Sequence, residues 1–484
     1  MSGLCSEFGL TCKRPARAHR MHLVSISPKR LDKIHVTFFS DDAVDPSPCP
    51  EPCRPSDRDR ASVAAAVSHR RPRAGNRLVE IGRTEIEKFA PGSRPVRHWP
   101  KRGRTFRRRR VLTFVCVGLA VVVVWLAISL EGALTNPALG SSLGARFAEW
   151  AREHGGASVV NWAENEWYSH HAPRVGGVPP KGAIRRPPST SVALTTGPPH
   201  LPPPTALQPF ASPAIAGEGQ WSPAGRLVGG IPAVYETTLR PDALHTSYVV
   251  GVAWMDTKLL RATLYSGSQI PGGAPFSHTA PIQPAASTSL VAAFNAGFLM
   301  SASNGGYYTD GKVIVPLRSG AASFVVYRDG TSTVGAWGRD VTMAPNVVAV
   351  RQNLDLLVDN GQPVSGLNAS DTTQWGDTLG NAVYVWRSGL GVTADGALVY
   401  VGGPGLNIVD LANLLVRAGA IRAMELDINT DWVNLSTYRP TSPTGSASAT
   451  NGTDLLSNMT GTPARYFNSW WARDFITMSS VPGK

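Results

Sequence analysis

The sequence predicts an α+β fold, a mainly antiparallel sheet domain with few helices, preceded by one transmembrane helix and a disordered N-terminal tail. Three observations lead to this prediction: an uncharged apolar run, an excess of positive charge confined to the residues before it, and short apolar runs separated by turn dipeptides after it. From them we predict a basic cytoplasmic tail (1–110), a transmembrane helix (111–130), a helical stalk (131–171), a proline-rich linker (172–225) and an extracytoplasmic domain (226–484).

The basic charge lies in the N-terminal tail. Residues 1–110 hold 25 Lys and Arg against 11 Asp and Glu, a net charge of +14, whereas the rest of the 484-residue chain has 22 against 23, a net charge of −1. The C-terminal part is therefore neutral, which excludes interpreting the high isoelectric point as nucleic-acid binding by that part. The tail is rich in Arg, Pro and Ser, so we expect it to be disordered, and nothing in it indicates a cytoplasmic regulator.

The cysteines also fall early in the chain, at Cys5, Cys12, Cys49, Cys53 and Cys116. The 368 residues that follow contain none, which excludes a disulfide-stapled fold and a thiolate zinc site there. Cys49 and Cys53 have no second pair of Cys or His at zinc-finger spacing, so we do not interpret them as metal ligands. The Ala-, Arg-, Pro- and Gly-heavy composition is typical of a GC-rich genome and favours a bacterial source.

The transmembrane helix is predicted from twenty consecutive uncharged residues at 111–130. At a rise of 1.5 Å per residue they extend roughly 30 Å, the thickness of a bilayer's hydrocarbon core. The run is too long and too far from the N-terminus for a signal peptide, and a buried core helix is the alternative. Six arginines between Arg102 and Arg110 precede it and Glu131 follows, so we expect a single-pass cell-membrane protein with its N-terminus in the cytoplasm.

The stalk and the linker differ in composition. Apolar residues at intervals of mostly three to five predict an amphipathic helix after Ser142, broken at Gly155 and Gly156. Residues 172–225 contain 13 prolines in 54 positions, which favours extended polyproline geometry. We therefore expect a semi-rigid spacer that holds the domain away from the membrane.

The C-terminal domain shows repeated hairpin signals. Asp-Gly or Asn-Gly dipeptides flanked by short apolar runs occur at 310–311, 329–330, 360–361 and 395–396. One helix is expected over Asn407–Ala418 and leads into the strand Ile421–Val433. At roughly 250 residues the domain can bury a substantial core.

The strand Ile421–Val433 is the first candidate for chemistry. Because side chains alternate along a strand, Glu425, Asp427, Asn429 and Asp431 are expected on one face. A half-exposed wet face is the structural alternative. Carboxylate pairs also perform glycoside hydrolysis, and the spacing leaves retention and inversion both open. Oxygen ligands at alternating positions would suit Ca²⁺ or Mg²⁺, so the metal content stays unknown and no cofactor is assigned.

Two further elements carry polar groups at strand ends. Asn295 and Gly297 follow an apolar strand and offer an amide side chain and a backbone open to close approach by a ligand. Arg387 precedes a glycine-containing turn, and its guanidinium fork matches a phosphate or a carboxylate. An ordinary turn and a salt bridge to the acidic strand are the structural alternatives.

Taken in order, these elements resemble the phosphodiester glycosidase family, the uncovering-enzyme-like hydrolases, over roughly residues 245–435. The resemblance is carried by Asn295-Ala296-Gly297-Phe298, by Arg387-Ser388-Gly389-Leu390-Gly391 with Thr393-Ala394-Asp395-Gly396, and by Met424-Glu425-Leu426-Asp427. It implies hydrolysis of a sugar-1-phosphodiester at the anomeric carbon, with an envelope glycan or glycosyl phosphate as substrate outside a bacterial membrane. No nucleic-acid or protein partner is indicated.

The resemblance also implies roles for the site residues. Asp427 would be the nucleophile or base, Glu425 its proton partner and Arg387 the phosphate ligand, while Asn295 and Gly297 would contact the sugar phosphate. The family follows its strand aspartate with a glycine-rich Asp-Gly-Gly-Gly-Ser turn, and this chain has side chains there instead. The substituting residues Asn429, Asp431 and Trp432 would supply polar contacts and a stacking ring for a different sugar. The alternative function is an envelope module that binds glycan without cleaving it.

Overall fold

The computed structural model describes residues 103–140, 142–156, 158–160, 162–163, 166, 174–187, 197–273, 275–371, 374–376, 383–460 and 462–483. Residues 1–102 of the predicted tail, with Cys49 and Cys53, lie outside this part.

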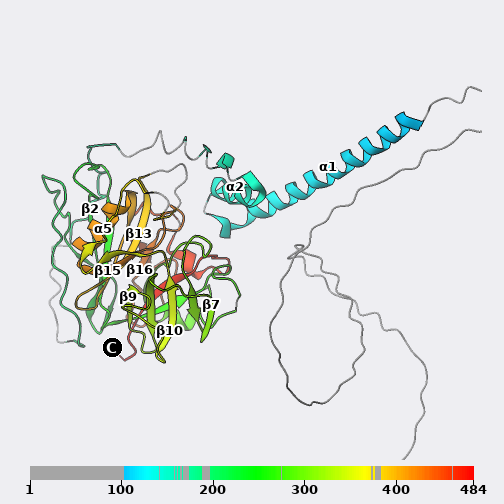
Figure 1. The fold of residues 1–484 in the computed structure, drawn as a ribbon. Coiled ribbons are helices and arrows are strands. Elements are labelled where there is room, and N and C mark those ends of the chain that lie inside the picture. The colour runs from blue at the N-terminus through cyan, green and yellow to red at the C-terminus, as the bar shows by residue number, and fades with distance from the viewer. Residues whose placement is uncertain are drawn as a thin grey trace, which may run out of the picture. The chain divides into compact units, whose positions relative to one another are not determined.

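A single long helix, α1 (Gly103–Thr135), covers the predicted transmembrane segment (Figure 1). Its stretch Arg107–Thr135 is long and apolar enough to cross a membrane, and its most apolar window has no buried residue. The predicted helix at 111–130 is thus confirmed as a helix that extends further at both ends. The short helices η1 (Pro137–Leu139), α2 (Leu143–Ala151) and η2 (Arg152–Gly156) follow. The last contains Gly155 at φ +83°, where a break in the helix was predicted.

The strands of the described chain form three sheets, and every pair of neighbouring strands is antiparallel. Besides α5 (Ile408–Arg417), the helices α4 (Pro284–Ser287) and η4 (Pro463–Phe467) lie between strands. The eight-stranded sheet runs β1 (Ser222–Val228), β2 (Ile231–Leu239), β3 (Val250–Met255), β14 (Leu398–Leu406), β13 (Val385–Thr393), β15 (Ala420–Glu425), β11 (Leu356–Asp359), β12 (Gln362–Pro363). One five-stranded sheet runs β7 (Lys312–Val315), β6 (Tyr307–Thr309), β10 (Val347–Gln352), β8 (Ala322–Tyr327), β9 (Ser332–Ala336). The other runs β17 (Gly452–Asp454), β16 (Leu435–Tyr438), β5 (Leu290–Asn295), β18 (Phe475–Ser480), β4 (Leu260–Tyr265). The mainly antiparallel fold with few helices is therefore confirmed.

The four predicted hairpin turns all join neighbouring antiparallel strands: β6 to β7, β8 to β9, β11 to β12 and β13 to β14. In the first, Asp310 and Gly311 have φ of +51° and +73°. Positive φ at both central residues is the turn geometry that matches the twist of the flanking strands, and Asp-Gly adopts it at low cost. The local sequence thus decides these turns.

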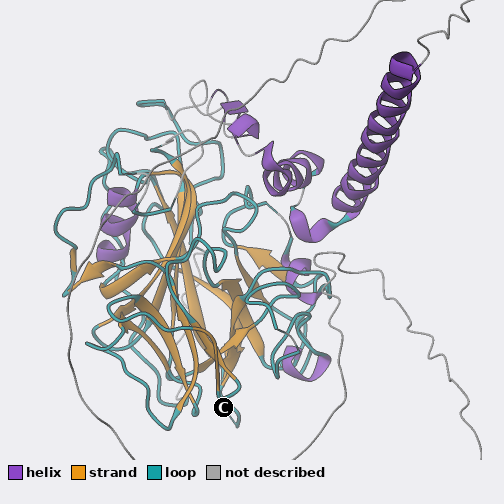
Figure 2. Ribbon diagram, turned by 45° about the vertical axis from the view of Figure 1, so that its right-hand side comes forward, coloured by secondary structure: helices purple, strands orange, loops and turns teal. Residues whose placement is uncertain are grey.

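The predicted helix is α5 (Ile408–Arg417), which lies beside the strands in Figure 2. Its N-terminus is fixed by a capping box in which Asn407 and Asp410 each bond the other's backbone. Leu411, Leu414 and Leu415 are buried and belong to a hydrophobic cluster with strands β3 and β14. The helix therefore covers one side of the eight-stranded sheet.

The described part of the proline-rich stretch packs on the sheet. Leu201 and Leu207 are buried in the same cluster as α5, and the Leu201 N–H donates to Asp256 Oδ2 at 2.8 Å. Arg185 donates to Glu236 Oε2, also at 2.8 Å. These residues therefore contact the folded domain, whereas composition predicted a semi-rigid spacer. The division of the chain into five parts stays a prediction.

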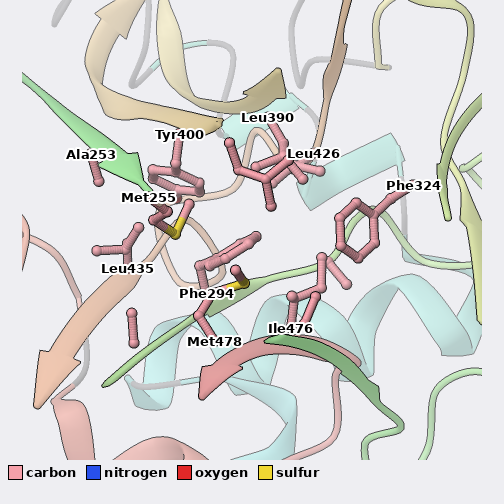
Figure 3. Packing of buried hydrophobic residues seen from close by; sticks show 14 of the residues in the cluster. Ala253, Met255, Phe294, Phe324, Leu390, Tyr400, Leu426, Leu435, Ile476 and Met478 are labelled. Atoms are coloured by element: carbon pink, nitrogen blue, oxygen red, sulfur yellow. The ribbon is translucent and has the colours of Figure 1, made fainter. Parts of the chain in front are cut away.

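The main hydrophobic core lies between the sheets (Figure 3). Phe294, Ile476 and Met478 from β5 and β18 face Tyr400 of β14 and Leu426, the residue that follows β15. Apolar burial of this kind contributes roughly 25 cal/mol per Å². Because the polar residues Asn295 and Asp427 directly follow Phe294 and Leu426 in the chain, the core fixes the strand ends that carry them.

Candidate active site

Polar side chains from all three sheets meet at one edge of this core. Asn295 ends β5 and pairs with Phe475, the first residue of β18. Glu425 ends β15 in the eight-stranded sheet. Arg351 comes from β10 in the third sheet. The site therefore depends on the assembled fold and on no single sequence segment.

Arg387 and Glu425 form a fully buried ion pair across neighbouring strands. Arg387 NH1 donates to Glu425 Oε1 at 2.6 Å, and the two side chains are 1% and 0% exposed. Arg387 also donates to the carbonyls of Leu406 and Trp375, each at 3.1 Å. The two backbone carbonyls hold the guanidinium in place, and the guanidinium in turn fixes the Glu425 carboxylate. The salt bridge to the acidic strand, which was the structural alternative for Arg387, is therefore present.

Asp427 lies two residues beyond the end of β15, yet the backbone ladder continues to it. The Ser388 N–H donates to the Asp427 carbonyl, and the Leu426 N–H donates to the Ser388 carbonyl, each at 2.8 Å. Ser388 Oγ also accepts from the Asp427 N–H at 3.2 Å. Asp427 is 1% exposed, and its Oδ1 accepts from the Asn429 N–H at 2.9 Å. The carboxylate is thus held by its neighbours in β13 and in the following turn.

Burial shifts the proton affinity of both carboxylates. It raises the pKa of Glu425 to about 7, although Arg387 opposes the shift and the Asp427 charge adds to it. Burial likewise raises the pKa of Asp427 to about 6, opposed by the charge of Arg473 and by the Asn429 N–H. Both shifts bring these carboxyl groups toward neutral pH, where one member of a coupled pair can hold a proton while the other is ionised.

Several buried polar atoms at the site have no hydrogen-bond partner. They are Glu425 Oε2, Asp427 Oδ2, Asp474 Oδ1 and Arg473 Nη1, four of the nine such atoms in the described residues. Buried polar atoms are ordinarily bonded, so these four atoms together are able to bind a ligand or water molecules. Two of these atoms belong to the carboxylates predicted to be catalytic.

Asn295 is bound to the scaffold on both ends of its amide. Its Nδ2 donates to Ser388 Oγ at 3.0 Å, and its Oδ1 accepts from the Tyr400 hydroxyl at 2.9 Å and the Asn434 N–H at 3.3 Å. It thereby ties β5 to β13 and β14. Gly297 lies against another site residue, because a Cβ there would be 3.0 Å from the Arg351 guanidinium. Both predicted residues are at the site, in contact with protein groups.

The predicted long strand is wrong beyond Glu425. The Asp427 side chain accepts from the Asn429 N–H, and the Asn429 side chain accepts from the Asp431 N–H at 2.8 Å. These local bonds compete with the ladder and turn the chain, so Asn429 and Asp431 do not share a strand face with Glu425. Trp432 is 6% exposed and packs edge-on against Trp471, with ring centroids 5.2 Å apart.

Four residues that the sequence analysis missed complete the site. Arg351 Nε donates to Asp474 Oδ2 at 2.6 Å, and both side chains are unexposed. Asn353 donates to the Glu425 carbonyl at 2.8 Å and accepts from the Phe298 N–H at 3.1 Å. Arg473 lies over the Trp432 ring. The available signals were the polar run Arg351-Gln352-Asn353 after an apolar strand and the charged pair Arg473-Asp474 before one.

No group of three or more His, Cys, Asp or Glu side chains in the described ranges could hold a metal ion. Asp427 instead faces the charges of Arg473 and Arg351, and Glu425 faces Arg387. Cationic neighbours of this kind are suited to an anionic ligand and not to Ca²⁺ or Mg²⁺ at these two carboxylates.

The sequence model of the phosphodiester glycosidase family matches residues 288–427, a range that includes Asn295, Arg387, Glu425 and Asp427. No curated protein matches the chain. The catalytic domain of a zebrafish N-acetylglucosamine-1-phosphodiester α-N-acetylglucosaminidase is 15% identical, over 54% of this chain and 87% of that chain, with a TM-score of 0.34. A hypothetical protein from Synechocystis is 13% identical, over 54% and 63% of the two chains, with a TM-score of 0.30. Over residues 288–427, therefore, this chain contains a domain of the phosphodiester glycosidase family.

Proposed function

We propose that the protein is a membrane-anchored hydrolase that cleaves a sugar-1-phosphodiester bond in glycans of the cell envelope. The observation that carries the proposal is the buried pair of Glu425 and Asp427, each with one unpartnered oxygen, inside a phosphodiester glycosidase domain. Their raised pKa values, to about 7 and about 6, provide one acid and one base near neutral pH.

In this mechanism Asp427 is the base or nucleophile. Its unpartnered Oδ2 attacks the anomeric carbon or takes a proton from the attacking water. Glu425 donates a proton from Oε2 to the leaving phosphate oxygen and takes one up again afterwards. The leaving phosphate is already acidic, so the step needs less help from a general acid than cleavage of an ordinary glycoside does. Asp427 therefore contributes more to the rate than Glu425.

Arg387 and Asn295 support this pair. Arg387 donates to Glu425 and to the carbonyls of Leu406 and Trp375, which favours a role in positioning Glu425. The family resemblance implies a second role for Arg387, contact with the phosphate. Asn295 fixes the end of β5 next to Ser388, whose hydroxyl contacts the Asp427 backbone. Asn429, Asp431 and Trp432 remain proposed substrate contacts in the turn that follows.

The membrane anchor is the helix α1. Its apolar stretch is long enough to span a bilayer, and Arg107–Arg110 at its N-terminal end favour a cytoplasmic N-terminus. The family domain then lies outside the membrane, where glycosyl phosphates of envelope polymers are the available substrates. Labelling of single cysteines placed at either end of α1 in intact cells tests this orientation.

The second candidate is a glycan-binding module without activity. Two observations favour it: the glycine-rich turn of the family is replaced after Asp427, and Glu425 and Asp427 are 0% and 1% exposed. A module of this kind would bind glycan without hydrolysing it, so it would release no sugar.

The two candidates are separated by turnover. The full-length chain, purified in detergent, is incubated with a panel of sugar-1-phosphodiesters beside Asp427→Asn and the surface control Arg328→Ala. Hydrolysis by the wild type and the control, reduced roughly 10²- to 10⁴-fold in Asp427→Asn, supports the hydrolase. Glycan binding with no hydrolysis of any member of the panel supports the module.

A further inference from the structure

Arg473 is a buried cation with an unused donor. The residue is 9% exposed, and its Nη1 has no hydrogen-bond partner in the described part of the chain. It immediately precedes Asp474 and the strand β18, so its backbone is fixed at the edge of the site. A guanidinium cannot lose its charge to escape this environment, because arginine stays protonated in proteins.

The other two buried arginines of the site are occupied. Arg351 donates to Asp474 Oδ2 and to the Gln352 carbonyl, each at 2.6 Å, and to the Phe298 carbonyl. Arg387 donates to Glu425 and to two backbone carbonyls. Arg473 has a contact of another kind, since its Cζ lies 4.6 Å from the centroid of the Trp432 ring. The ring contacts the guanidinium as a cation–π partner, and Nη1 remains without a hydrogen-bond partner among the described residues.

The buried charge of Arg473 would be stabilised by a bound anion. Burial lowers its pKa, and the charges of Asp427 and Asp474 act in the opposite direction. Neither carboxylate forms an ion pair with it among the described residues, although each has an unpartnered oxygen. Burying a charge without a partner is expensive, and a bound anion that accepts from the guanidinium removes that penalty.

The charge balance of the site admits one further negative charge. Arg351, Arg387 and Arg473 supply three positive charges, and Asp427, Asp474 and Glu425 supply three carboxyl groups. Glu425 is protonated below its pKa of about 7. Counting the other two carboxyl groups at their formal charge of −1, the six residues then carry a net charge of +1. A phosphodiester has a single negative charge.

From these observations we propose that Arg473 binds the phosphate of the substrate, between its own guanidinium edge and Asp427, with Trp432 stacked behind it. The inference deepens the proposed hydrolase function and rests on it for the identity of the substrate. It assigns the phosphate to a residue outside the segment that matches the family, and it leaves Arg387 to position Glu425.

The assignment gives Arg473 a role in the chemical step. Cleavage breaks the bond between the anomeric carbon and the phosphate oxygen, and the electron pair stays on the phosphate. In the direct route water attacks the anomeric carbon, its hydroxyl stays on the sugar and its other proton passes to Asp427. In the covalent route Asp427 forms an ester with the anomeric carbon, and water then hydrolyses that ester and frees the carboxylate. The leaving phosphate changes from a singly to a doubly charged monoester. Arg473 therefore binds the product side of the reaction more strongly than the substrate and lowers the barrier.

The test uses the full-length chain in detergent and inorganic phosphate as the probe. Calorimetric titration in phosphate-free buffer compares the wild type with Arg473→Ala, Arg473→Lys and the surface control Arg328→Ala. We expect the wild type and the control to bind equally. Arg473→Ala should bind about 10- to 100-fold more weakly, as for the loss of a charge-assisted hydrogen bond, with Arg473→Lys between them. Thermal melting of each variant shows whether it is folded.

Turnover separates the failure of this inference from the failure of the proposed function. On a sugar-1-phosphodiester that the wild type hydrolyses, Arg473→Ala should lower kcat roughly 10²- to 10³-fold. Equal phosphate affinity in the wild type and a folded Arg473→Ala, or no phosphate binding by the wild type, overturns the anion site. Phosphate binding that depends on Arg473 without any turnover by the wild type leaves the anion site standing and overturns the hydrolase.

Discussion

Arg387 in β13 donates a 2.6 Å hydrogen bond to Oε1 of Glu425 in β15, while Oε2 of the same carboxyl group has no partner. Oε1 of Glu425 is therefore fixed by Arg387, whereas Oε2 can accept or donate a further hydrogen bond. Asp427, two residues further along, shows the same division between Oδ1 and Oδ2. Both available oxygens belong to groups whose pKa burial raises. This arrangement makes the site sensitive to pH.

The first prediction is a bell-shaped dependence of kcat/KM on pH. Below about 6 Asp427 is protonated and cannot act as base or nucleophile, and above about 7 Glu425 is ionised and cannot donate a proton. We expect a maximum between these values. In Glu425→Gln the alkaline limb should disappear, because Gln does not titrate, while the acid limb stays. An alkaline limb of the same midpoint in both proteins would assign that limb to another group.

The second prediction concerns stability. The ordinary pKa of Glu is 4.5, and burial raises that of Glu425 to about 7, so the folded state binds the proton more tightly than the unfolded state does. The stabilisation from this proton is complete below about 4.5 and is lost as the pH rises through about 7. Relative to Glu425→Gln, the wild type should lose on the order of a few kcal/mol of unfolding free energy over that window.

The check is the melting temperature of both proteins at several pH values between 4 and 8, in the same detergent. Other titrating groups affect the two proteins alike, so only the difference between the curves is interpreted. Parallel curves would show that Glu425 titrates alike in the folded and unfolded states, and the assignment of the acid would fail with them.

Much of the fold could be predicted because it is decided locally. The Asp310-Gly311 turn and the Asn407 cap act within a few residues, and the structure has both where the sequence placed them. Glu425 and Asp427 could be singled out as candidates for the same reason, because alternation along one strand places the two carboxylates close together; their catalytic role stays a prediction. The end of that strand was missed because the Asn429 side chain, two residues beyond Asp427, redirects the backbone.

The rest of the site depends on contacts between distant segments. Arg351 and Asp474 are 123 residues apart in sequence and form an unexposed ion pair. Nothing in either local sequence specifies the other as partner. The burial of Leu201 in the proline-rich stretch is likewise decided by the sheet that it meets and by its bond to Asp256. Such contacts follow from tertiary packing, which a single sequence does not display.

A third prediction tests that packing. Arg185, in the proline-rich stretch, donates to Glu236 Oε2 and to the carbonyls of Asp454 and Leu455. Arg185→Ala leaves the buried carboxyl of Glu236 without this cation and should lower the unfolding free energy by about 1–3 kcal/mol. Arg186→Ala is the matched control, because Arg186 is the next residue, its side chain is exposed, and it makes none of these bonds. Equal melting temperatures in the two variants would show that this contact does not stabilise the domain, as expected of the semi-rigid spacer that composition predicts.

The last prediction concerns the space at Gly297. Its φ lies outside the left-handed region, so only the added volume opposes a substitution. A Cβ would approach the Arg351 guanidinium to 3.0 Å and Asn353 Oδ1 to 3.2 Å, and both groups already bind the backbone of Phe298. Neither can withdraw without losing a buried hydrogen bond. Gly297→Ala should therefore lower the unfolding free energy by about 1–3 kcal/mol.

The same substitution should also lower kcat, because Asn353 holds the backbone of Glu425. Denaturant unfolding and turnover of the full-length variant measure the two effects, and a normal unfolding midpoint with reduced kcat would place the whole effect at the active site.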